Sequence, residues 1–215
     1  MKKILIALVM CFGIAQLGIG QIAGTGHDFS DGVGLDWSWN GDGTGEEGIC
    51  QPCHTPHGGD MTGAPLWSHA ASTAASFNLY TSGTLNATMA DPTGISLQCL
   101  GCHDGSTPLD SHSGITGSFY LVDGTHTSYV GTDLRNDHPV SFVYGSALDA
   151  GLYDPTTQDA TIGTGTVENE LLFGGATGTR TMECASCHDP HGAGIDNLLR
   201  VTMAGSELCL NCHNK

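Results

Sequence analysis

One long apolar stretch occurs along the chain, and it lies at the N-terminus. Residues 4–19 are almost continuously apolar and follow two lysines. A basic start, an apolar stretch of this length and small residues near its end are typical of a secretory signal peptide. A permanent membrane anchor is the alternative, but the stretch is short for a span. We therefore expect residues 1–20 to be cleaved, and residues 21–215 to form a single domain that is exported through the periplasm without a membrane span.

Beyond this stretch, apolar positions follow neither a long helical period nor a long alternation. Short apolar runs such as residues 140–144 predict short strands or loop anchors, and residues 104–183 contain no clean amphipathic helix. A short helix is predicted near the C-terminus, beginning near Ser206 as its N-cap. With 32 glycines, the chain is poor in apolar segments that could pack on one another. We expect mostly irregular backbone with few short helices and minimal short strands.

A five-residue pattern, C-x-x-C-H, occurs four times and uses eight of the nine cysteines. It is the attachment signature of c-type haem, in which two thiols form thioethers and the next histidine binds iron. A zinc site or disulfides are the alternatives, but neither requires a histidine after every pair. Four covalently bound haems c would supply the missing core of a haem-templated multihaem cytochrome c fold. The predicted attachment residues are Cys50, Cys53, Cys99, Cys102, Cys184, Cys187, Cys209 and Cys212, and the iron ligands that follow them are His54, His103, His188 and His213.

The four patterns fall into two alternating types. Residues 50–58 and 184–192 share a trailing Pro-His-Gly, whereas residues 96–103 and 206–213 share a serine three positions before Cys-Leu-x-Cys-His. The order along the chain is therefore one type, then the other, twice over. This order suggests two pairs of haems.

Seven of the 11 histidines lie outside the patterns, and four would give every iron a second axial histidine. His57 and His191 each follow a pattern histidine by three residues, a link too short to reach the opposite face of the same haem. Each should therefore bind a different haem from its own pattern. Pro139 holds His138 extended, and for His69 the alternative is that it packs on a haem beside Trp67. We expect mostly or entirely bis-histidine ligation, with distal ligands among His27, His57, His69, His138 and His191.

The charge is strongly negative, at −16 for the whole chain. Without the two lysines of the signal peptide, four basic residues face 22 acidic residues, which gives −18. Such a surface repels nucleic acid and anionic membranes and favours ferric iron. Residues 40–47 resemble the start of a calcium loop, but an acidic loop without calcium is the preferred interpretation because the expected glutamate is absent. No phosphate loop or nucleophile motif occurs, so we do not expect an enzyme.

Several stretches, together with their order, carry a family resemblance across most of the exported chain: residues 27–30, 50–58, 64–69, 96–105, 136–144, 184–192 and 209–215. They resemble those of the OmcE-type extracellular tetrahaem cytochromes. The resemblance implies polymerisation into an extracellular filament that conducts electrons through a continuous haem chain. It also allows an iron ligand to be shared between subunits, for which His27 is the candidate. The implied partners are further copies of the chain, other multihaem cytochromes and extracellular electron acceptors; a monomeric periplasmic or surface carrier and a haem reductase with one open iron site are the alternatives.

Overall fold

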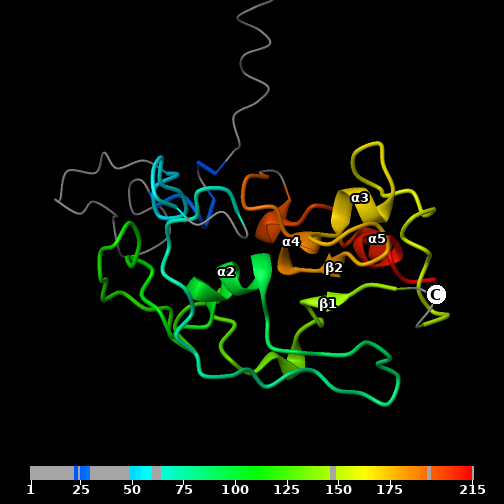
Figure 1. Cartoon of the computed structure of the whole chain (residues 1–215), viewed down its shortest axis with the longest axis horizontal. Helices are drawn as coiled ribbons and strands as arrows, with labels where there is room; N and C mark the ends of the chain where they lie inside the picture. Colours follow the sequence, from blue (N-terminus) through cyan, green and yellow to red (C-terminus); the bar gives the residue numbers. More distant parts are fainter. Residues whose placement is uncertain are drawn as a thin grey trace, which may run out of the picture.

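Irregular backbone dominates the protein, as expected, with short helices and one small sheet (Figure 1). The structure is a computed structural model that describes residues 22–23, 25–29, 49–59, 64–145, 149–192 and 195–214. The expected signal peptide and the candidate calcium loop at residues 40–47 lie outside these ranges. The helices are α2 (Gly94–His103), α3 (Val167–Leu171), α4 (Cys184–Cys187) and α5 (Glu207–Leu210), with 3-10 turns at Leu134–Asn136, Asp196–Leu198 and Ala204–Ser206.

The sheet consists of two short antiparallel strands, β1 (Phe142–Val143) and β2 (Thr181–Met182). In the register of the pair, Phe142 faces Met182 and Val143 faces Thr181. The strand β1 confirms the prediction of a short strand within the apolar run at residues 140–144, although Ser141 just before it has a φ of 58°. The sheet joins two segments that are far apart in the sequence, and one of them leads directly into α4.

A small apolar core surrounds this sheet in the C-terminal half. Its members come from the residue after β1, from α3 and its C-cap, from β2 and from the turn after α5, so the fourth C-x-x-C-H pattern contributes a thiol to the core. Burial of such apolar side chains is worth about 1.5–3 kcal/mol for each large residue. The buried members are Tyr144, Val167, Leu171, Leu172, Met182 and Cys212.

The helix α3 lies in a region where no clean amphipathic helix was predicted. Val167 and Leu171 are four positions apart, which places them on one face of the helix, and both are buried. The prediction failed here because a helix of five residues is too short to produce a recognisable apolar period. Helices this short form in proteins because tertiary packing stabilises them.

The helix α5 begins at Glu207, as predicted, but not by the predicted capping bond. Ser206 precedes it with a φ of 62° and makes no side-chain bond to the first turn. A serine in the left-handed region holds its backbone in a conformation that only a few per cent of residues other than glycine adopt. The neighbouring turn, rather than the hydroxyl, therefore sets the start of α5.

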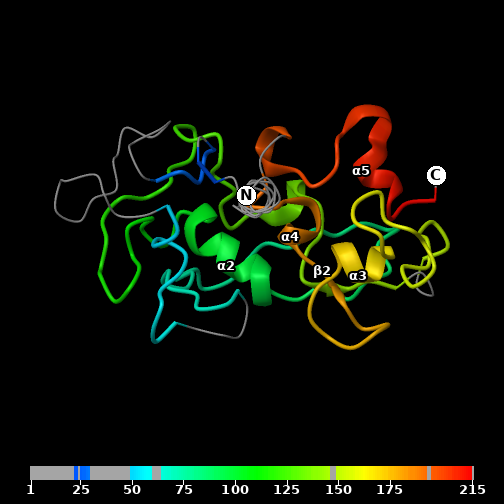
Figure 2. The same ribbon diagram turned by 90° about the horizontal axis from the view of Figure 1, so that it is seen from above.

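The helices α2 and α4 pack against each other in the middle of the molecule (Figures 1 and 2). Gly101 of α2 approaches the chain of residue 70 closely, because a Cβ there would lie 3.0 Å from the carbonyl oxygen of Ala70. The packing of α2 against α4 brings together the second and third C-x-x-C-H patterns, which are far apart in the sequence. Within the described ranges, no helix has the length and apolar character needed to cross a bilayer.

Candidate haem-attachment site

The four C-x-x-C-H patterns follow one another along the longest axis of the molecule, in sequence order (Figures 1 and 2). The first pattern, residues 50–54, lies in turns, and the second ends α2. The third occupies α4 and the fourth lies on α5 and the turn after it. In the first, third and fourth patterns, the peptide N–H of the histidine donates to the carbonyl of the first cysteine, and the second pattern has the same turn because it lies within α2. This turn brings both thiols and the imidazole together. His54 N, for example, donates to Cys50 O at 2.8 Å.

Three of the pattern histidines use Nδ1 to bind a backbone carbonyl. When Nδ1 carries the proton and donates to a carbonyl, the neutral ring presents Nε2 as its lone-pair donor. Such bonds also fix the orientation of histidines that bind metals. The observed contacts are His54 Nδ1 to Pro65 O at 2.7 Å, His103 Nδ1 to Ser128 O at 2.7 Å, and His188 Nδ1 to Asn197 O at 2.8 Å.

Three pattern histidines face a second histidine from elsewhere in the chain. With metal–imidazole bonds of about 2 Å, two rings on opposite faces of one iron have centres about 6 Å apart. The observed spacings fit this geometry, and the donor set is the one that c-type haem iron uses. The ring centroids of His54 and His191 are 6.1 Å apart, those of His27 and His103 5.9 Å, and those of His138 and His213 6.3 Å.

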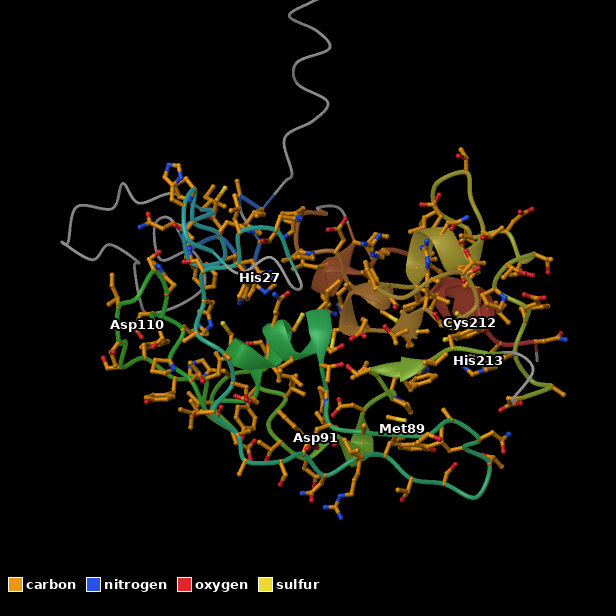
Figure 3. The ribbon with its side chains drawn as sticks, viewed as in Figure 1. His27, Met89, Asp91, Asp110, Cys212 and His213 are labelled. Carbon is orange, nitrogen blue, oxygen red and sulfur yellow. The ribbon has the colours of Figure 1, made fainter. Side chains whose placement is uncertain are left out.

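His27 is half-buried within its own chain. Burial lowers the pKa of His27 to about 4, with smaller contributions from His103, His188 and His191. Burial also lowers the pKa of His103. Both rings are thus neutral near pH 7, which is the form that binds metals. Figure 3 shows His27 above α2, and its ring centroid is 5.9 Å from that of His103 of the same chain. Iron ligation by His27, within the chain or in a neighbouring subunit, stays a prediction.

The thiols of neighbouring patterns lie close to one another. The hydrogen bond with Cys184, followed by burial, raises the pKa of Cys99. Burial, with a smaller effect of Cys53, raises the pKa of Cys102, and burial raises the pKa of Cys212 to about 11. All eight cysteines of the described ranges are free. Cys99 of the second pattern therefore lies beside Cys184 of the third.

The first and third patterns share one local fold, which matches their shared sequence type. In both, the chain turns back after the Pro-His-Gly segment and pairs with the pattern. Both return segments also contain a leucine in the left-handed region, Leu66 with φ 55° and Leu198 with φ 57°. The equivalent bonds are Thr55 N to Leu66 O at 3.0 Å and Ser68 N to Cys53 O at 2.8 Å in the first, and Asp189 N to Leu198 O at 2.7 Å and Arg200 N to Cys187 O at 2.8 Å in the third.

Two predicted distal ligands have other surroundings. His57 is exposed on the turn after the first pattern. His69 is buried, and its ring lies between backbone carbonyls, with Nδ1 2.8 Å from Ala70 O and Nε2 3.0 Å from Pro108 O. The same Nε2 is 3.3 Å from Cys102 Sγ. Iron ligation by these two residues stays a prediction.

Sequence reasoning missed a buried carboxylate beside the third pattern. Glu183 is the N-cap of α4, and its peptide N–H donates to Ser186 Oγ at 2.9 Å in a capping box. The sequence held one signal for it, an acidic residue directly before a cysteine pair that starts a helix. Thr181 is a neighbour in the sequence, but Ser96 and Ser141 come from distant segments and could not be read from the sequence.

No described group of three or more histidine, cysteine, aspartate or glutamate side chains is arranged to hold a metal ion directly. Residues 178–215 match the family of the doubled CXXCH motif. No curated protein matches the chain at a significant level. The match covers the third and fourth patterns, and it supports a multihaem c-type cytochrome with covalently bound haem that transfers electrons.

Proposed function

We propose that this protein is a tetrahaem electron-transfer cytochrome in which every iron has two histidine ligands. The observation that carries the proposal is the set of facing histidines, His54 with His191, His27 with His103, and His138 with His213, at 5.9–6.3 Å between ring centroids. A bound haem supplies an iron that alternates between ferric and ferrous and so carries one electron. Two imidazole ligands leave no open position for a substrate, which favours a conduit over an enzyme.

The remaining ligand pair is His188 with His57. The local fold shared by the first and third patterns supports this assignment. His191, which follows the third pattern, faces the histidine of the first pattern. By the same relation, His57, which follows the first pattern, serves the histidine of the third. Each trailing histidine would then tie its own segment to the other pattern's haem.

The chain's own residues hold the haems in place and set their surroundings. Thiols would hold each porphyrin edge, carbonyls orient three of the four pattern histidines, and the imidazoles of His27, His138 and His191 would close the second face. Attachment sites that follow one another along the longest axis suit electron hopping from one end of the molecule to the other (Figure 1).

We further propose that copies of the chain polymerise into an extracellular filament. A row of haems that runs from end to end could continue into the next copy only if the terminal haems approach the surface. Cys50 and Cys209, the first thiols of the outermost patterns, are both exposed. Exchange with other multihaem cytochromes and with extracellular acceptors would take place at these ends, after export of the chain.

The haem number and ligation are tested on the exported chain. Mass spectrometry should give the mass of residues 21–215 plus four haems, and the ferric protein should show only low-spin signals by electron paramagnetic resonance. A mass with fewer haems would contradict the tetrahaem assignment. A stoichiometric high-spin signal would contradict ligation of every iron by two histidines.

A monomeric carrier and a haem reductase are the competing functions. Negative-stain microscopy of secreted material distinguishes the filament from the carrier, because strictly monomeric particles at high concentration would exclude polymerisation. Carbon monoxide or cyanide distinguishes the conduit from the reductase. A rapid spectral change of one haem would indicate an open iron and favour the reductase.

A further inference from the structure

A buried carboxylate lies between the second and third haem-attachment sites. Glu183 is 4% exposed and directly precedes Cys184. Its carboxylate accepts hydrogen bonds from the hydroxyl of Ser96, from Ser141 Oγ at 3.0 Å and from Thr181 Oγ1 at 2.7 Å. The peptide N–H of Ser96 donates to the same carboxylate at 3.3 Å. Four donors from three separate segments therefore converge on one side chain.

This environment suits a negative charge. A hydrogen bond from a hydroxyl or an amide stabilises a carboxylate, whereas a protonated carboxyl would need an acceptor of its own. All the bonds described for the Glu183 carboxylate are accepted rather than donated. Neither of the two ion pairs formed by the described residues, Arg135 with Asp133 and His191 with Asp189, involves it. The charge is thus hydrogen-bonded but not neutralised by a cation.

The carboxylate is one hydrogen bond away from both attachment sites. Ser96 lies on α2, three residues before Cys99, and its Oγ also accepts the peptide N–H of Cys184 at 3.0 Å. The sulfur atoms of Cys99 and Cys184 lie beside each other. Glu183 therefore clamps the two helices that carry the second and third patterns, at the place where those patterns meet.

We infer that Glu183 is a positioning and redox-tuning residue for the two central haems. This inference rests on the proposed function, because it requires haem at the second and third patterns. An uncompensated negative charge in a buried site raises the free energy of the iron that gains an electron and so lowers its reduction potential. The two central haems therefore have lower reduction potentials than the same ligands and hydrogen bonds would give them without this charge. An electron that crosses the molecule must therefore take a step that is uphill in free energy when it reaches the central haems.

The variant Glu183→Gln keeps the size of the side chain and removes its charge. Spectroelectrochemical titration should show two of the four haems shifted to higher potential, with about a tenfold increase in the ferrous-to-ferric ratio at a fixed applied potential, equal to about 59 mV for one electron. The matched control is Glu170→Gln. Glu170 lies in α3 and its carboxylate also accepts a peptide N–H, that of Gly165 in the loop before α3, at 3.0 Å. The control should leave all four potentials unchanged.

A second variant separates the charge from the clamp. Ser141→Ala removes one donor and leaves the charge, so the less stabilised carboxylate should lower the two central potentials, opposite in sign to Glu183→Gln. If Glu183 acted only as a structural clamp, both variants would loosen the same contact and shift the potentials in the same direction. Equal shifts of all four haems, no shift in Glu183→Gln, or a rise in Ser141→Ala would each overturn the inference.

Haem content keeps this inference separate from the proposed function. Each variant and the unaltered protein are weighed by mass spectrometry before titration. If the unaltered protein lacks four haems, the proposed function fails. If it carries four haems and the central potentials do not move, only the role of Glu183 fails. If Glu183→Gln does not mature with haem, the sign of the shift in Ser141→Ala decides.

Discussion

At the scale of single residues, histidine pairing is the main determinant of the site. Spacing alone could predict that His57 and His191 bind a haem other than that of their own pattern, because a link of three residues cannot pass around a porphyrin. The structure places His191 against His54, as that reasoning requires. The partner of His27 could not be predicted, since contact with His103 depends on folding across a long, irregular segment.

Replacement of His191 by alanine tests this pairing. The iron held by His54 would lose its distal ligand, so one haem of the four should become high-spin and bind carbon monoxide. The control is His126→Ala, because the His126 ring packs on Phe119 and accepts a backbone N–H from Val122. The measurement is electron paramagnetic resonance with carbon monoxide difference spectra. An all-low-spin spectrum for His191→Ala would exclude the proposed ligand role.

Tyr144 offers a second test at this scale. Its hydroxyl is buried and lies 3.0 Å from the carbonyl oxygens of both Tyr153 and Cys212. Tyr144→Phe would remove this donor from both carbonyls, and only Cys212 O would keep another, the peptide N–H of Tyr153 at 2.9 Å. The expected cost is about 1–2 kcal/mol in the free energy of unfolding. Tyr120→Phe is the control, since Tyr120 is 43% exposed. Guanidinium unfolding followed by circular dichroism should show a lower midpoint for Tyr144→Phe alone.

At the scale of elements, the alternation of sequence types could be read directly, and the shared fold of the first and third patterns agrees with it. What could not be read is how that fold is made. Leucine disfavours the left-handed region, so neither Leu66 nor Leu198 signals a turn in the sequence. The short helices α3 and α4 were not predicted either, because tertiary contacts rather than intrinsic propensity stabilise them.

Glycine at position 59 is required by this local fold. A Cβ on Gly59 would lie 2.5 Å from the carbonyl carbon of Leu66, a backbone atom that cannot move aside cheaply. Gly59→Ala should therefore push apart the return segment that orients His54, and destabilise the protein by more than about 1 kcal/mol. Gly83→Ala is the matched control, because its added Cβ meets nothing within 4 Å. Thermal unfolding compares the two, and equal melting temperatures would contradict this account.

At the scale of the whole molecule, composition correctly predicted a mostly irregular fold. A glycine-rich chain with few apolar segments has only a small core of its own, which the structure places around β1, α3 and β2. The location of that core in the C-terminal half could not be predicted, because its members are scattered over many short segments. The order of the attachment sites along the longest axis likewise depends on how irregular backbone is threaded, and no periodicity records this (Figure 1).

The proposed assembly of copies into a filament should depend on salt, because the chain is strongly negative. The exported chain carries four basic against 22 acidic residues, so copies repel one another at low ionic strength. An increase from about 0.01 M to 0.15 M salt shortens the screening length from about 30 Å to about 8 Å. We expect the critical concentration for filament growth to fall over this range, as measured by light scattering and negative-stain microscopy. A critical concentration that rises with salt would show that charge attraction, rather than apolar contact, joins the subunits.

The contact between Cys99 and Cys184 also constrains how the protein is made. Both cysteines are half-buried once α2 and α4 have packed, and their thiols then lie beside each other. A chain that collapsed first would restrict access to these sulfur atoms for the enzyme that joins them to vinyl groups. Maturation must therefore proceed on an open polypeptide, with porphyrin insertion completed at the centre before the two halves close.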